Sequence, residues 1–320
     1  PTRPASYAFA SLPSIDTRAD AIDPDRLGPQ LAAGQGYLGF VRQGRMETLG
    51  VDMTTGRLEH VVVLPNPTYL PLISAGLTGV MVLCLLFKLY PVAAVFALAT
   101  LVSFFFWSAR SGSRVDEGPI DVGRGEKAPP DTEVEGPTQW WAMVFALAAN
   151  GTLFASLVFG ALYLWLVAPA WPPTEIVAPN LWVIAAAVLL TAGALVMRMT
   201  DGLNRAGKAF IPMLAMTLTV DMAVLGVLSM AVFLLPDPTS HAHAATVAAL
   251  IGYGWLHAFG GLMFGLNGLL KARNGYVSPR RSLDLRLARL WHDYTAVTGV
   301  LGMALVLLMP SLIGMLEGVR

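Results

Sequence analysis

The stretch WWAMVFALAANGTLFASLVFGALYLW, residues 140–165, decides the fold class. It is almost wholly apolar and exceeds the ~20 residues that a helix rising 1.5 Å per residue needs to cross ~30 Å of hydrocarbon. Lipid offers backbone groups no hydrogen-bond partner, so such a run must be helical. One amide, that of Asn150, lies well inside this run and requires an explanation.

The composition of the whole chain agrees with a membrane location. Of 320 residues, 55% are hydrophobic and 13% are charged, whereas about a quarter of the residues of a soluble protein are charged. Basic and acidic residues number 21 each, so no nucleic-acid partner is expected. The single thiol, Cys84, has no second cysteine with which to form a disulfide or a metal cage.

The hydropathy pattern predicts an all-α membrane protein with seven transmembrane helices. These lie near residues 69–87, 90–109, 139–168, 179–199, 208–235, 243–271 and 290–315. We expect residues 1–66 to be a small cytoplasmic tail, in which METLGVDMTTGRLEHVVVLP (46–65) forms a β hairpin around its TTG turn. Residues 67–110 form a two-helix transmembrane hairpin, residues 111–138 a polar, flexible linker, and residues 139–320 a five-helix bundle. The arrangement is therefore two plus five.

Lysine and arginine are concentrated in alternate connections, which predicts the orientation of the chain. The connections after the second, fourth and sixth helices carry most of them: Arg110, Arg114, Arg124, Lys127, Arg198, Arg205, Lys208, Lys271, Arg273, Arg280, Arg281, Arg286 and Arg289. The connections after the third and fifth helices carry none. We expect the amino-terminal side to be cytoplasmic and the carboxyl terminus to be external.

Three polar side chains within the apolar helices are candidates for function, since a polar group in hydrocarbon is costly unless it has a partner. Asn150 is either a hydrogen-bonding contact between helices or part of a pathway. Asp221 must be protonated, paired or hydrated, and either relays protons or faces other helices through a hydrogen bond. His257 shares a helix face with Gly254, Gly261, Gly265 and Gly268. Small residues on one face let helices approach closely, so this face predicts helix packing and places His257 inside a helix contact.

The sequence LWHDY (290–294) is predicted to lie at the membrane interface. Trp291 and Tyr294 are residues typical of the interfacial aromatic belt. His292 and Asp293 can remain hydrated there, and Arg286 and Arg289 can bind lipid phosphates.

Three blocks of the chain resemble subunit III of the haem-copper cytochrome c oxidases. They are residues 140–165, the block GYGWLHAFGGLMFGLNGLLKAR (252–273), and the block RLWHDYTAVTGVLG (289–302). YAFASLP (7–13) and residues 46–72 resemble the junction of bacterial polypeptides in which subunits I and III are fused, so residues 1–66 resemble the end of oxidase subunit I. Two departures stand out: Asn150 replaces the family's intramembrane acid, and the second block has one histidine where the family commonly has two.

The resemblance implies a non-redox part of an aerobic, proton-translocating terminal oxidase in the bacterial inner membrane. Haem and copper are then expected in the upstream subunit I part, on the same polypeptide, and in a separate subunit II, with cytochrome c or a similar donor supplying electrons. This chain itself is expected to carry no catalytic residue and no metal, and to bind phospholipid. The lipid or interface candidates are Trp140, Trp141, Arg273, Trp291 and His292. The alternatives are a transporter or channel using Asn150, Asp221 and His257, and a scaffold unconnected with any oxidase.

Overall fold

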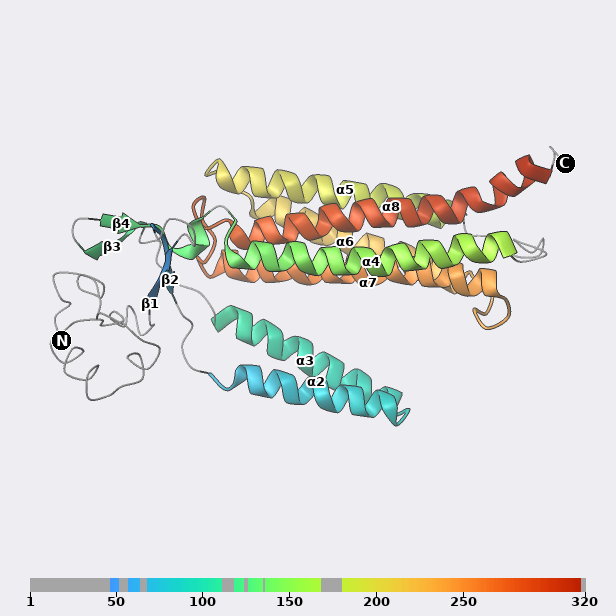
Figure 1. The fold of residues 1–320 in the computed structure, drawn as a ribbon, viewed down its shortest axis with the longest axis horizontal. Helices are drawn as coiled ribbons and strands as arrows, with labels where there is room; N and C mark the ends of the chain where they lie inside the picture. Colours follow the sequence, from blue (N-terminus) through green and yellow to red (C-terminus); the bar gives the residue numbers. More distant parts are fainter. Residues whose placement is uncertain are drawn as a thin grey trace, which may run out of the picture. The chain divides into compact units, whose positions relative to one another are not determined.

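The computed structural model describes residues 47–51, 57–63, 68–110, 118–123, 126–134, 136–167 and 180–317. The chain divides into two compact units, Pro1–Pro137 and Thr138–Arg320. The first unit contains strands β1 to β4 and helices α2 and α3, and the second contains helices α4 to α8 (Figure 1).

Six helices in the described ranges are long and apolar enough to cross a membrane, and a seventh, α2, is apolar but shorter. The helices are α2 (Leu70–Leu86), α3 (Tyr90–Arg110), α4 (Thr138–Val167), α5 (Asn180–Arg205), α6 (Ile211–Phe233), α7 (Ala242–Arg273) and α8 (Leu283–Glu317). The chain is thus an all-α, multi-pass membrane protein in its principal architecture, as its hydropathy predicts.

Helices α2 and α3 lie side by side in the first unit and are joined by a tight turn (Figure 1). Lys88 lies in this turn with a φ of 60°. This left-handed backbone conformation is uncommon for residues other than Gly and Asn. Between the two helices, the buried hydroxyl groups of Ser74 and Ser103 are hydrogen-bonded to each other. Such a contact between two small residues holds apolar helices together where lipid provides no competing partner.

The first unit also contains two small antiparallel β ladders. Strands β1 (Glu47–Val51) and β2 (Leu58–Val63) pair with each other, as the predicted hairpin requires. The predicted TTG turn and residues 1–46 of the predicted tail lie outside the described residues. Strands β3 (Ile120–Gly123) and β4 (Glu126–Ala128) form the second ladder, and a short 3₁₀ turn, η1 (Asp131–Glu133), follows.

The described part of residues 111–138 is folded, whereas the sequence predicts a flexible linker. The backbone N–H of Val61 on β2 donates to the carbonyl of Pro129 at 2.9 Å. Val61, Ile120 and Ala128 are all buried. The segment has too few apolar residues to form a core alone, but Val61 of β2 packs with them and completes a small core.

In the second unit, α5, α6, α7 and α8 pack closely together, and α4 packs on α7 and α8 (Figure 1). Each helix contributes to one apolar core, which includes Phe154, Leu190, Leu228, Ile251 and Met303.

Two helices of this unit extend beyond their apolar runs. Helix α5 continues to Arg205, and α8 begins at Leu283 instead of near residue 290. Leu285 and Ala288 are completely buried against Met197 and Leu214. The first turns of α8 therefore combine buried apolar residues with partly buried charged ones, and hydropathy alone does not detect them.

Candidate functional site

A deeply buried polar contact between helices of the bundle joins Asp221 of α6 to His292 of α8. The Nε2 atom of His292 lies 3.1 Å from Oδ2 and 3.3 Å from Oδ1 of Asp221. The two residues are 4% and 5% exposed. The intramembrane carboxyl group therefore has a partner, a histidine that is 71 positions away in the sequence.

The second ring nitrogen of His292 is also engaged. Its Nδ1 lies 2.7 Å from the carbonyl oxygen of Ala288, one turn earlier in α8. Both nitrogens thus have fixed partners, and the ring cannot rotate without losing two hydrogen bonds.

Glycines surround this pair. A Cβ atom at Gly261 of α7 would lie 3.2 Å from Nε2 of His292. A Cβ atom at Gly193 of α5 would lie 3.6 Å from Oδ1 of Asp221, and one at Gly265 of α7 would lie 3.9 Å from its Oδ2 and 2.8 Å from a methyl group of Leu218. The absence of side chains at these positions makes room for the pair.

The predicted glycine face of α7 lies along its contacts with α6 and α8. Gly254 faces Met303 and Leu228, and Gly268 faces Leu285 and Leu214. All four glycines of this face are buried. Gly261 and Gly265 are the two that border the Asp221–His292 pair.

His257 forms a second, aromatic cluster between α7 and α8. Its ring stacks on Trp291 with centroids 5.3 Å apart and lies 4.1 Å from the ring centroid of Tyr253. Its Nδ1 contacts the Tyr253 carbonyl at 2.9 Å, and its own carbonyl accepts a hydrogen bond from Nε1 of Trp291 at 2.8 Å. Nε2 of His257 is buried and has no hydrogen-bond partner among the described residues. Sequence analysis places His257 inside a helix contact, and the structure agrees.

Asn150 touches this aromatic cluster through its backbone. The side-chain Nδ2 of Asn150 donates to the carbonyl of Ala146 in the same helix at 3.1 Å. Its carbonyl accepts a 3.3 Å hydrogen bond from the hydroxyl of Tyr253, which also lies 2.7 Å from the hydroxyl of Tyr294. The side-chain amide of Asn150 therefore forms its hydrogen bond within α4. The contact between helices is made by the backbone carbonyl of Asn150.

The candidate lipid and interface residues fall into two groups. Trp140 and Trp141 lie in the first turns of α4 with their rings edge to face, and half of Trp141 is exposed. Arg273 ends α7. By contrast, Trp291 bonds inward to His257, and His292 is buried against Asp221. The structure corrects the interfacial interpretation of His292, because α8 begins earlier and places this residue inside the bundle.

An ion-pair cluster at the α5–α8 contact was not identified as a site from the sequence. The completely buried carboxylate of Asp201 accepts hydrogen bonds from Arg205 of α5 and, at 2.8 Å, from Nη1 of Arg289 of α8. Two further ion pairs also involve α8: Arg198 of α5 pairs with Asp293 at 2.7 Å, and Lys271 of α7 pairs with Asp284 at 2.7 Å. The four-residue spacing of Asp201 and Arg205 within a helix was the available signal.

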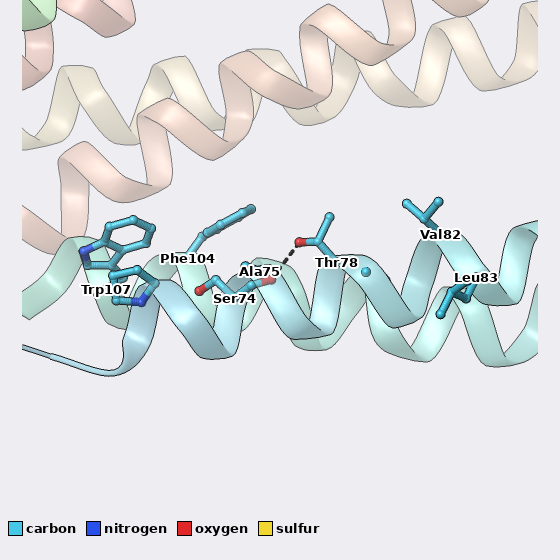
Figure 2. Close-up of a pocket in the computed structure, with 9 residues that line it drawn as sticks. Ser74, Ala75, Thr78, Val82, Leu83, Phe104 and Trp107 are labelled. Carbon is cyan, nitrogen blue, oxygen red and sulfur yellow. Dashed lines mark hydrogen bonds between the residues drawn. The ribbon is translucent and has the colours of Figure 1, made fainter.

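An apolar groove of about 710 Å³ runs along α2 and α3 (Figure 2). Figure 2 shows Phe104 and Trp107 of α3 beside Ser74 and Thr78 of α2, with the Thr78 hydroxyl donating to the Ser74 carbonyl at 2.8 Å. The lining residues are Pro71, Ser74, Ala75, Thr78, Gly79, Val82, Leu83, Phe104 and Trp107. An acyl chain fits the chemistry of this lining.

Within the described ranges, no group of three or more His, Cys, Asp or Glu side chains is placed to hold a metal ion. A comparison of the chain with protein-family models and with curated proteins finds no match.

Proposed function

We propose that this chain is the subunit III-like, non-redox part of an aerobic terminal cytochrome c oxidase. Such an oxidase transfers electrons from cytochrome c to oxygen and couples this to proton translocation. The proposal rests on the resemblance of three sequence blocks. It is supported by the distribution of helices, with two in the unit Pro1–Pro137 and five in the unit Thr138–Arg320.

The observation that carries the scaffold role is the way the intramembrane polar groups are used. Asp221 bonds to His292, and Asn150 bonds to its own helix. No hydrogen bond in the described part of the chain joins Asp221 to Asn150 or to His257. A transporter that used these three residues along one path would need them to share a route. Their engagement in packing contacts favours a scaffold.

Lipid binding is the second part of the proposal. The groove along α2 and α3 presents an apolar surface for an acyl chain. Trp141 at the start of α4 and Arg273 at the end of α7 are suited to headgroup contacts, since Trp prefers the interface and Arg binds phosphate. Trp291 is not included, because its Nε1 donates a hydrogen bond inward to the His257 carbonyl.

In this proposal the chain lies in the bacterial inner membrane with its amino-terminal side in the cytoplasm and its carboxyl terminus outside. Its partners are oxidase subunit I, upstream on the same polypeptide, and subunit II. Haem and copper belong to those partners, and cytochrome c or a similar protein donates electrons.

Affinity purification from native membranes tests the proposal. A tag at the carboxyl terminus, solubilisation in a mild detergent, and a reduced-minus-oxidised optical spectrum are expected to show haem co-purifying with the chain. An unrelated tagged membrane protein from the same cells is the control. If the chain instead purified without haem and transported a solute in liposomes by itself, the oxidase proposal would be abandoned for the transporter.

The lipid assignment has its own test. Trp141→Ala and Arg273→Ala are expected to reduce the phospholipid that remains bound after detergent purification and to shorten the turnover lifetime of the complex. Trp182→Ala, on α5, is the matched control for loss of a tryptophan. Unchanged bound lipid and lifetime in both variants would remove the lipid assignment and leave the scaffold role intact.

A further inference from the structure

We infer that Asp221 and His292 form a single proton-binding site within the membrane, in which the two side chains together hold one proton and the pair is electrically neutral. This inference stands on the bundle geometry and does not depend on the oxidase proposal.

The hydrogen bonds determine the number of protons. The carbonyl of Ala288 can only accept, so Nδ1 of His292, 2.7 Å away, carries a hydrogen. Nε2 faces the carboxyl oxygens of Asp221 at 3.1 and 3.3 Å. A hydrogen bond there requires one proton between the two groups, carried either by the imidazole or by the carboxyl.

Both arrangements leave the pair without net charge. With the proton on Nε2, a cationic histidine faces an anionic aspartate, and with the proton on the carboxyl both groups are neutral. Removing the proton leaves a buried anion, and adding a second leaves a buried cation. Each of these changes places an unbalanced charge in a low-dielectric interior, which strongly disfavours it.

No other described ionisable group replaces either partner. The helices packed against the pair present glycines to it, namely Gly193 of α5 and Gly261 and Gly265 of α7. On α8, the neighbouring Asp293 is already paired with Arg198 of α5. His257 of α7 contacts Tyr253 and Trp291.

The surroundings of the pair are closely packed. Nε2 lies close to Gly261 of α7, and the carboxyl group lies near Gly193 of α5 and Gly265 of α7. The pair is therefore almost completely shielded from solvent, with exposed fractions of 4% for Asp221 and 5% for His292.

Counting the protons directly tests the inference. The full chain, labelled with ¹⁵N-histidine and ¹³C-carboxyl aspartate, is measured in detergent micelles at neutral pH. Nitrogen NMR reports whether Nε2 of His292 carries a hydrogen, and infrared spectroscopy reports whether the Asp221 carboxyl is protonated. His292→Gln and Asp221→Asn assign the two signals, and His257→Gln is the control that leaves both unchanged.

The expected count is one, with either a protonated Nε2 and an ionised carboxylate, or a bare Nε2 and a protonated carboxyl. A count of zero or two at neutral pH would overturn the inference. The proton count is made on the unmodified chain, so it can be obtained even if an assignment variant fails to fold. In that case, sequential NMR assignment identifies the two residues.

Discussion

Gly261→Ala tests whether the glycine face of α7 exists to accommodate the Asp221–His292 pair. The added methyl group would lie 3.2 Å from Nε2, 3.3 Å from Cε1 and 3.6 Å from Cδ2 of His292. The separations from Nε2 and Cε1 are shorter than ordinary van der Waals contacts, so the imidazole must move by a few tenths of an ångström. The ring is held on both sides, by Ala288 and by Asp221, and has little freedom to do so.

The expected cost follows from three contributions. Overpacking a well-filled interior costs about 1–3 kcal/mol, and weakening a polar contact between membrane helices costs about 0.6–2 kcal/mol. Replacing a helical glycine by alanine returns about 0.5–1 kcal/mol. The net destabilisation is therefore about 0.6–4.5 kcal/mol, which corresponds to a decrease in Tm of about 1–18 °C for a unit of this size.

Thermal unfolding in detergent measures this change, and Gly254→Ala is the matched control. At Gly254 the nearest atoms to an added methyl group are side-chain carbons at 3.5 and 3.8 Å, an ordinary contact distance. The control is expected to leave Tm unchanged or to raise it slightly. If Gly261→Ala were as stable as Gly254→Ala, the reasoning that glycine is required beside His292 would be refuted.

Three further predictions concern other contacts. Asp201→Asn is expected to destabilise the bundle by about 2 kcal/mol, because it weakens the charged hydrogen bonds from Arg205 and Arg289. Asp293→Asn breaks a pair with an arginine side chain that is 60% exposed, and is expected to cost only about 0–1 kcal/mol; equal shifts in Tm would contradict this ranking. Ser103→Ala removes the buried contact with Ser74, and the loss of about 0.6 kcal/mol is expected to increase labelling of the buried Cys84 thiol about threefold, whereas an unchanged rate would show that the contact does not hold α2 to α3. Asn150→Asp removes the donor to the Ala146 carbonyl when the introduced carboxyl is ionised, so stability is expected to decrease by about 1 kcal/mol as the pH rises in the variant only; a flat profile in the variant would contradict this account.

The apolar helices were predictable from the sequence because crossing a bilayer imposes both a length and a composition. The predicted and observed bounds agree closely for α2, α3 and α4, where apolar runs end abruptly. They differ most for α8. Its first turns bury Leu283, Leu285 and Ala288, while the charged residues between them are only partly buried. An average over a window hides such a stripe, although a 3.6-residue period reveals it.

The partners of the polar residues were not predictable in the same way. Asp221 lacked a visible partner because His292 is far away in the sequence and because its helix was expected to start later. With α8 beginning at Leu283, His292 lies several turns inside the helix and within reach of α6. The β3–β4 ladder was missed for a related reason, since its core needs Val61 from a distant strand. Composition describes a segment by itself, and these contacts depend on two segments together.

The most direct test of the proposed function is the ratio of haem to this chain in the complex purified through it from native membranes. The account predicts that a constant, whole-number amount of haem accompanies each chain across gel filtration, together with oxygen reduction that is supported by cytochrome c or a similar donor. A homogeneous preparation that contains the chain but neither haem nor oxygen-reducing activity would contradict it.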